Sequence, residues 1–429
     1  MDTPLAPGAG NPVFDHEPDY ARVKFPDAGY RILALYRFWN IIEYWYPNRD
    51  LPGQNRDRAL ADSLSLIALA PDGEAYKREL LKLIALAQDT HANLWGSLAS
   101  RPPVGDCQMP EVVRFVEGKA VVTGSAAKDH ATGELNAGDV IEDLDGTPVD
   151  QLVERRRPYY ADSNEAARLR DIAQSMTRGA CGSSQVRIQR GSEMLTVTVA
   201  RVPLATLDPR AGSTHDRPGS AFQKLTDEVA YLKLSNVKAA DAASYVKEAS
   251  GTKGLIIDIR NYPSEFVVFA LGSLLVDKPV EFARFTVGDL ANPGAFHWGE
   301  TLSQRPAQPH YNGKVVIVVD EVSLSQAEYT AMALRVATNA VVVGSTTAGA
   351  DGNVSPFALP GGLRTLISGI GVFYPNKNPA QRIGILADVP VKPTIEGIRA
   401  GRDEVLETAI RQIVGTGVPE AQIEAMAKP

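Results

Sequence analysis

Hydrophobic positions follow two different spacings along this chain. Between residues 30 and 87, apolar and aromatic side chains recur at helical spacing and predict three helices, over residues 30–46, 58–70 and 74–87. From residue 102 to residue 203, short alternating runs bounded by glycine turns predict strands. Beyond residue 204, continuous apolar runs alternate with helical patterns. This order predicts a helical unit, a β unit and an α/β core with a largely parallel sheet.

The most regular strand of the core is predicted at residues 315–319, an unbroken run of valine and isoleucine. Such a run is typical of a strand buried on both faces of a parallel sheet. Helical spacing begins near Ser325, so this serine lies at the carboxyl end of the strand, where the N–H groups of a first helical turn point at an anion. Ser325 is therefore a candidate nucleophile. The alternative is that Ser323 or Ser325 only caps the helix.

The rest of the core alternates strands and helices, with two interruptions. Residues 288–310 predict a long irregular insertion, a kind of segment that often lines a site. Residues 348–362 predict a glycine-rich loop without GxGxxG or GxxxxGK[ST], so a phosphate cradle is unsupported. The other regular elements are predicted at residues 229–234, 240–249, 254–260, 266–275, 283–287 and 340–344.

A histidine follows the third predicted helix, in the segment Gln88-Asp89-Thr90-His91-Ala92. An imidazole beside an acid and a hydroxyl is a candidate general base. The alternative is that His91 hydrogen-bonds the last carbonyls of the helix, which is common at helix ends. This segment alone leaves both possibilities open.

Length and composition bound the organisation of the chain. A chain of 429 residues is too long for one ordinary core, and we expect a flexible lead-in over residues 1–24, a helical domain over 25–101, a β domain over 102–203, an α/β core over 204–415 and a tail over 416–429. The net charge of −7 argues against nucleic acid as the main partner. No apolar run approaches the roughly 20 residues of a membrane-spanning helix. The first residues have no export-signal pattern, so for an exported protein we expect that the signal has been removed.

Cysteine and histidine are sparse. Cys107 and Cys181 lie in the predicted β domain without a CxxC pair or zinc-type spacing. They form either one disulfide in an oxidising compartment or two buried thiols, and the sequence leaves both open. The six histidines include no HExxH or similar cluster, so we expect no metal site.

The β domain contains a recognisable pattern. L-x-x-G-D-x-I begins at Leu135 and is followed by D-G-x-x-V from Asp145. This pattern resembles the PDZ domain over about residues 104–202. The resemblance implies that the domain adds the extended end of a peptide to the edge of its sheet by backbone pairing.

Three motifs flank this domain. Asp89-Thr90-His91-Ala92 precedes it, and Ser325-Gln326-Ala327-Glu328 and then Gly344-Ser345-Thr346-Thr347-Ala348-Gly349 follow it. In this order they resemble the carboxyl-terminal processing (tail-specific) serine protease family, over about residues 30–413. The resemblance implies a crotonase-like α/β core and an endopeptidase that acts on polypeptides or their carboxyl termini. It also implies a periplasmic or secreted location and no metal or organic cofactor.

The family has two catalytic plans. In the serine–lysine plan, a lysine stands in the glycine-rich loop at the place that Ala350 holds here, so that plan fails. The tricorn-type plan uses a histidine with a neighbouring hydroxyl before the PDZ domain, the serine, and a late glutamate. His91, Thr90 and Ser325 fit these positions, and the glutamate position falls on Gln381. A glutamine can orient an imidazole by hydrogen bonding but cannot stabilise its cation by charge.

The same resemblance assigns the binding groups around the nucleophile. The N–H of Gln326 is expected to form one half of an oxyanion hole, and the turn after Arg260 the other half. Pro263 has no N–H in that turn, so the second donor is Ser264 or a neighbour. Substrate contacts are expected from Gly349, Ala350 and Tyr262. For Asp258 and Arg260 we expect an ion pair at the end of the sheet, not a catalytic role.

Two other functions use the same scaffold. One is binding of a peptide or an apolar ligand by a relative without catalytic activity. This alternative remains open because Ala350 and Gln381 stand where the family has catalytic residues. The other is hydrolysis of an ester or a small amide by the same serine. A hydrolase requires His91 Nε2 within hydrogen-bond reach of Ser325 Oγ, although this contact can be loose without substrate. A binding protein would instead have a closed apolar cavity and a misplaced serine.

Overall fold

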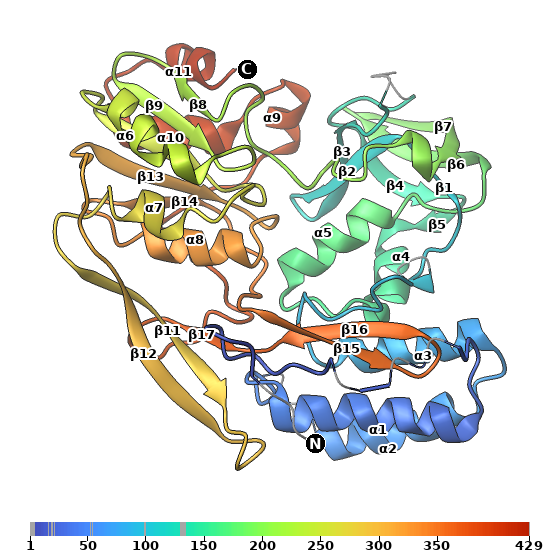
Figure 1. Cartoon of the computed structure of the whole chain (residues 1–429). Helices are drawn as coiled ribbons and strands as arrows, with labels where there is room; N and C mark the ends of the chain where they lie inside the picture. Colours follow the sequence, from blue (N-terminus) through green and yellow to red (C-terminus); the bar gives the residue numbers. More distant parts are fainter. Residues whose placement is uncertain are drawn as a thin grey trace.

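The computed structural model describes residues 5–428 apart from residues 16, 19, 21, 52, 54, 98, 99 and 129–133. Figure 1 shows three groups of elements: helices α1–α3 below, a β-rich unit at the upper right and a mixed α/β core at the upper left. Residues 1–4 of the predicted flexible lead-in lie outside the described residues. Within the described part of the lead-in, Phe14 is buried and packs edge-on against Phe357. This part of the lead-in is therefore packed, because it carries an aromatic side chain that the helical unit buries.

The N-terminal helices are α1 (Ala28–Trp45), α2 (Arg56–Ala68) and α3 (Gly73–Ala85). Each begins at a polar residue whose side chain accepts a hydrogen bond from the first turn: Asp27, Asn55 and Asp72. The three predicted helices are thus confirmed to within two residues at each end.

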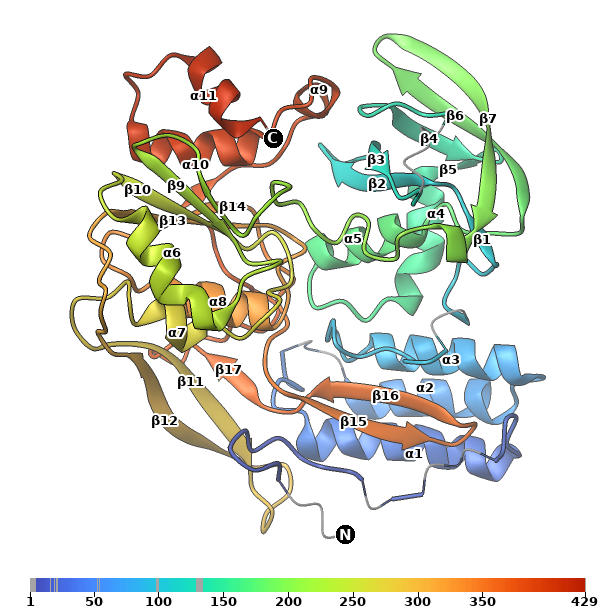
Figure 2. The ribbon, with the colours of Figure 1, turned by 45° about the horizontal axis from the view of Figure 1, so that its top comes forward.

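A hairpin from late in the chain packs onto these helices. Strands β15 (Val354–Leu359) and β16 (Leu363–Ser368) are antiparallel, and they lie beside the N-terminal helices in Figures 1 and 2. Their buried side chains share a hydrophobic cluster with those of α1 and α3. The prediction of a glycine-rich loop over residues 348–362 is wrong for residues 354–359, which form β15. Buried side chains such as Phe357 and Leu359 make it a strand, and Gly361 and Gly362, both with positive φ, form the turn.

The middle unit is a seven-stranded antiparallel sheet with the order β1-β7-β6-β4-β3-β2, in which β5 pairs with β4. Two helices belong to it, α5 (Glu165–Ser175) and α4 (Val149–Arg156), and α4 was not predicted. The PDZ resemblance of this unit stays a prediction. Its strands are β1 (Cys107–Gln108), β2 (Glu111–Val116), β3 (Lys119–Ser125), β4 (Val140–Leu144), β5 (Thr147–Pro148), β6 (Gly182–Arg190) and β7 (Glu193–Pro203).

The core sheet has the order β18-β14-β13-β10-β9-β8, and all of its neighbours are parallel except the edge strand β8. This confirms the predicted α/β class. The strands are β8 (Phe222–Lys224), β9 (Val229–Lys233), β10 (Gly254–Asp258), β13 (Lys314–Val319), β14 (Val341–Gly344) and β18 (Val389–Pro390).

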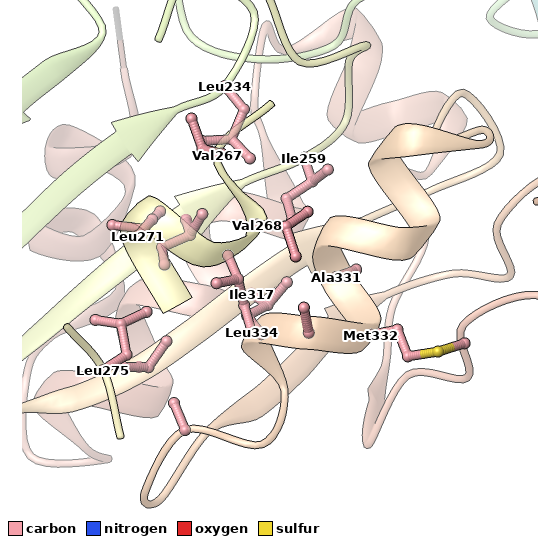
Figure 3. Packing of buried hydrophobic residues seen from close by; sticks show 14 of the residues in the cluster. Leu234, Ile259, Val267, Val268, Leu271, Leu275, Ile317, Ala331, Met332 and Leu334 are labelled. Atoms are coloured by element: carbon pink, nitrogen blue, oxygen red, sulfur yellow. The ribbon is translucent and has the colours of Figure 1, made fainter. Parts of the chain in front are cut away.

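The run in β13 is continuous because both faces of the sheet are covered. Val315, Ile317 and Val319 pack with α6 (Ala242–Ala249), α7 (Val268–Gly272) and α8 (Gln326–Leu334). Val316 and Val318 pack on the other face with α10 (Glu404–Val414) and α11 (Glu420–Ala427). Figure 3 shows Ile317 beside Leu334 of α8 in the first of these clusters. The predicted tail over residues 416–429 therefore contains a packed helix, α11.

A third sheet extends from the core. Strand β11 (Val280–Gly288) pairs with β12 (Phe296–Gln304) on one side and with β17 (Gly371–Phe373) on the other. The irregular insertion predicted over residues 288–310 is therefore mostly a strand and its turn. The remaining elements are short: α9 (Ile395–Arg399) and the 3₁₀ turns η2 (Arg157–Tyr159), η3 (Leu204–Thr206) and η4 (Ala239–Asp241). Among the described helices, none is both long and apolar enough to cross a membrane.

Cys107 and Cys181 form a disulfide that joins the start of the middle unit to the segment before β6, 74 residues later in sequence. Of the two possibilities that the sequence left open, the structure has the disulfide. Cys107 begins β1, and Cys181 directly precedes β6.

We predict that the oxidised protein contains no free thiol under denaturing conditions without reductant, and two after reduction. Closing a loop of this length stabilises the folded state by about 4 kcal/mol in the chain-entropy account. The paired variant Cys107→Ser with Cys181→Ser should therefore unfold at a clearly lower denaturant concentration. Two free thiols in the untreated protein would contradict the prediction.

Candidate active site

Ser325 and His91 line one cleft of about 580 Å³. Ser325 comes from the core and His91 from the segment after α3, so two regions of the fold enclose the cleft. Its walls are largely apolar and aromatic. They include Trp95, Tyr262, Phe266, Phe285, Leu324, Tyr329, Leu366, Ile370 and Val372.

Ser325 stands at the turn between β13 and α8 with an unusual backbone. Its φ of 57° and ψ of −116° are rare for a residue with a side chain. Such strain persists only where the surroundings enforce it, and it is common at functional sites. The Ser325 N–H donates to the carbonyl of Ala350 at 2.9 Å. Ser323, the alternative serine, is fully buried and donates from its hydroxyl to the carbonyl of Ile259, so its role is structural.

The carboxylate of Glu328 ties the turn at Ser325 to the next loop. Its Oε1 accepts from the Thr347 hydroxyl at 2.5 Å and the Gly349 N–H at 2.8 Å, and its Oε2 from the Ala350 N–H at 2.9 Å. Oε2 also accepts a long hydrogen bond, 3.4 Å, from the Ser325 N–H. Burial raises the pKa of Glu328, and these donors oppose the rise.

The imidazole of His91 is held by a serine that the sequence did not identify. Its Nδ1 lies 2.9 Å from the hydroxyl of Ser368, the last residue of β16. That hydroxyl donates to Asp89 Oδ1 at 3.0 Å, and Asp89 also accepts from the Ser368 N–H at 2.7 Å. A hydroxyl has one proton, so the proton between Ser368 and His91 comes from Nδ1. This leaves Nε2 of the neutral ring with a lone pair, as a general base requires.

Asp89 supplies the negative charge of this arrangement. It is fully buried, and its Oδ1 lies 3.5 Å from His91 Nδ1. Burial acts to raise the pKa of Asp89. The interactions with His91 and with the Ser368 amide outweigh burial, so the pKa lies below its usual value. Asp89 is therefore ionised at neutral pH, directly behind the imidazole.

Thr90 and Gln381 lie near this group, but among the described contacts neither hydrogen-bonds the imidazole of His91. The hydroxyl of Thr90 donates to the Oγ of Ser163 at 3.1 Å and accepts from the Ser163 N–H at 3.0 Å. Gln381 Nε2 reaches the hydroxyls of Tyr46 and Ser163 and, at 3.5 Å, Asp89 Oδ1. Thr90 therefore contacts Ser163, and Gln381 contacts Ser163 and Asp89, so neither touches the imidazole of His91 by these bonds.

The oxyanion donors require one correction. In the described structure the Gln326 N–H, first in α8, has no acceptor and borders the cleft. Ser264 is excluded as the second donor, because its N–H donates to the Leu234 carbonyl at 2.9 Å. Its neighbour Tyr262 lines the cleft, and no acceptor among the described residues binds its N–H.

Gly349 and Ala350 also differ from expectation. Both are buried, and their N–H groups donate to Glu328, so they support the nucleophile and do not offer groups to a substrate. The residues of this loop that line the cleft are the next ones, Asp351 to Val354. Tyr262, the third expected substrate contact, does line the cleft.

The expected ion pair at the end of the sheet is present. Arg260 Nη2 lies 2.7 Å from Asp258 Oδ2 and 2.8 Å from Asp403 Oδ2. All three groups are away from the cleft lining. The pair therefore anchors the turn that carries Tyr262.

One group of possible metal ligands exists among the described residues: His215, Asp320 and Glu321. Arg114 of β2 already pairs with both carboxylates, at 2.9 Å and 2.5 Å. His215 Nδ1 bonds Asp320 at 2.6 Å. A guanidinium thus occupies the place of a cation, and the group joins the middle unit to the core.

Sequence reasoning missed Ser368 and the role of Asp89. Asp89 was within reach, because it stands two residues before His91 in the quoted motif. Ser368 had no such signal, since it lies 277 residues from His91 in an ordinary strand.

Residues 228–391 match the sequence family described as Peptidase family S41. None of the curated proteins is similar in sequence to this chain. The mutant structure of CPAF aligns with a TM-score of 0.71 and 14% identity, over 91% of this chain and 99% of that chain. The structure of mature CPAF complexed with lactacystin aligns with a TM-score of 0.69 and 14% sequence identity, over 93% of this chain and 99% of that chain. The structure of a putative peptidase from Parabacteroides merdae aligns with a TM-score of 0.57 and 16% sequence identity, over 92% of this chain and 98% of that chain. At these identities the structural likeness shows the fold alone.

We predict that Glu328→Ala lowers the free energy of unfolding by about 3–5 kcal/mol, because buried donors lose their acceptor at roughly 1–3 kcal/mol each. Denaturant unfolding measures this change. Glu154→Ala, at an exposed position of α4 with only a surface ion pair, is the matched control and should change stability by under about 1 kcal/mol. Equal stability of the two variants would show that Glu328 does not hold the turn.

Proposed function

We propose that this protein is a serine endopeptidase in which Ser325 is the nucleophile and His91 its general base, because residues 228–391 match Peptidase family S41. The observation that carries the proposal is the shared cleft, with a strained serine on one side and, on the other, an imidazole whose Nδ1 is engaged by Ser368. No hydrogen bond between Ser325 and the imidazole is among the described contacts, so the pair is proposed to close when substrate binds. The substrate class is polypeptide, as the family implies.

The reaction follows from these groups. Ser325 Oγ attacks the scissile carbonyl carbon while Nε2 of His91 takes the hydroxyl proton. The N–H groups of Gln326 and Tyr262 stabilise the oxyanion. The tetrahedral intermediate then loses the amine, which receives the proton from His91, and an acyl-enzyme forms. A water molecule gives its proton to His91 and attacks the ester, and Ser325 regains its hydrogen.

The imidazolium that forms during this cycle needs a compensating charge. The predicted glutamate position is a glutamine, Gln381, which has no charge. Asp89 takes over that role in our proposal, through the Ser368 hydroxyl and by its own proximity to Nδ1. Thr90 and Gln381 then orient Asp89 and Ser163, and act on His91 indirectly.

This arrangement weakens the main alternative, a scaffold retained only for binding. That alternative rested on Ala350 and Gln381. Ala350 hydrogen-bonds the nucleophile turn, and Gln381 has a charged neighbour in Asp89. The open, aromatic cleft also favours a polypeptide over a small ester or amide, because Tyr262 and Phe266 expose more than half of their surface at its rim.

We further propose that the protein works in the periplasm or outside the cell. The Cys107–Cys181 disulfide supports this, because disulfides persist in oxidising compartments. The carboxyl-terminal end of a polypeptide is the proposed target, and the PDZ-like unit the proposed docking site for that end.

We predict that Ser325→Ala and His91→Ala each abolish hydrolysis of an unfolded protein such as reduced casein. The loss should come without a loss of fold, because a serine at a helix start contributes only about 1 kcal/mol as a cap. Release of peptides measures turnover, and circular dichroism checks the fold. Wild-type activity in a folded Ser325→Ala protein would exclude Ser325 as the nucleophile.

A second prediction concerns the hydrogen bond behind the base. Ser368→Ala should lower kcat about 10-fold or more with little change in KM, as part of the roughly 10²–10⁴ that a positioned base contributes. Ser355→Ala, at a fully buried serine of the paired strand β15 that does not line the cleft, is the control and should keep kcat. Equal kcat values in the two variants would remove Ser368 from the mechanism.

A further inference from the structure

Asp351 is an unusual feature of the cleft wall. It follows Ala350, whose carbonyl accepts from the Ser325 N–H, so it lies one residue from the support of the nucleophile. The residue is 5% exposed. Oδ1 accepts from the Gly352 N–H at 2.7 Å, whereas Oδ2 has no hydrogen-bond partner among the described residues. The proposed mechanism does not use this carboxyl group.

Asp351 is the only carboxyl group in the described lining of the cleft. The described lining contains no lysine or arginine, and its only other titratable groups are His91 and the phenols of Tyr262 and Tyr329. The ring of Phe266 stacks on that of Tyr329 with 6.2 Å between the ring centroids, and the centroid of the Phe285 ring lies 5.7 Å from that of Tyr329. Aromatic faces beside an unpartnered acid suit a side chain with a long apolar stem and a cationic tip.

We propose that Asp351 is a specificity-determining residue that binds the lysine or arginine side chain of a polypeptide next to the scissile bond. The inference rests on the proposed peptidase function and names the substrate class of that site. A carboxylate of the substrate finds no cation in the described lining, so cleavage inside a chain fits the cleft better than removal of a terminal residue.

The protonation of Asp351 gives the proposal a distinct readout. Burial, followed by the charge of Glu328, raises its pKa well above the usual value, which favours the protonated form in the empty cleft. The groups near it are Glu328 and Tyr329 on α8, Tyr374 after β17, and His91 across the cleft. A bound ammonium or guanidinium lowers this pKa, and the proton leaves to solvent. Binding of a basic side chain should therefore strengthen as pH rises towards the pKa of the empty site, while a neutral side chain shows no such change.

The test compares internally quenched octapeptides that differ only by lysine or norleucine at one position, scanned along the peptide. Wild-type protein should cleave the lysine peptide at the preferred position with the higher kcat/KM. Asp351→Asn keeps the shape and the Oδ1 acceptor, and should lower kcat/KM for lysine about 30-fold or more. Its kcat/KM for norleucine should not fall. Asp277→Asn, the same charge change at an exposed position outside the cleft, is the control.

A binding arm separates this proposal from the catalytic one. Ser325→Ala protein is titrated calorimetrically with both peptides in two buffers of different ionisation enthalpy. Release of about one proton with lysine and none with norleucine supports the role of Asp351, even if the wild type hydrolyses nothing. Preference of the wild type for norleucine, equal cleavage of lysine by Asp351→Asn, or binding of lysine without proton release would each overturn it. If Asp351→Asn does not fold, the pH dependence of the wild-type KM and the proton release still decide.

Discussion

The buried carboxylate of Glu328 is the contact on which the site depends. It stands in the first turn of α8 and accepts hydrogen bonds from the hydroxyl of Thr347 and the N–H groups of Gly349 and Ala350. These bonds fasten the loop after β14 against the start of α8, and the Ala350 carbonyl then accepts from the Ser325 N–H. The strained backbone of Ser325 is held from both sides as a result. An apolar residue at position 328 would leave several buried donors without an acceptor.

The second half of the site depends on packing between distant segments. The hairpin β15–β16 follows the loop after β14 in sequence, and Figure 2 shows it lying against the N-terminal helices. Its apolar side chains are buried in one cluster with those of α1 and α3. This packing carries Ser368 to Asp89 and His91, at the end of the helical unit. The base and the nucleophile can therefore keep their places only if the hairpin links the helical unit to the core. Damage to the cluster around Phe357 would be expected to displace His91 before it unfolds the core sheet.

Sequence patterns predicted those parts of the protein whose local chemistry repeats. The run 315–319 predicted β13 because both faces of the parallel sheet are covered, and the motif around Ser325 gave the nucleophile turn. Other parts depended on contacts that no local pattern encodes. The Ser264 N–H was expected to face the substrate, but the Leu234 carbonyl takes it. Gly349 and Ala350 were expected to bind substrate, yet Glu328 uses their N–H groups. Ser368 lies in an ordinary strand far from His91 in sequence, so only the folded hairpin reveals its role.

The most direct test of the account is to map the site of reaction with a fluorophosphonate. Such reagents phosphonylate a serine whose hydroxyl a neighbouring base activates. The folded protein is treated with the reagent and digested, and mass spectrometry of the peptides should find a single adduct, on Ser325. The His91→Ala protein should form no adduct at the same reagent concentration. An adduct on another residue, or equal labelling of Ser325 in the absence of His91, would contradict the proposed Ser325–His91 pair.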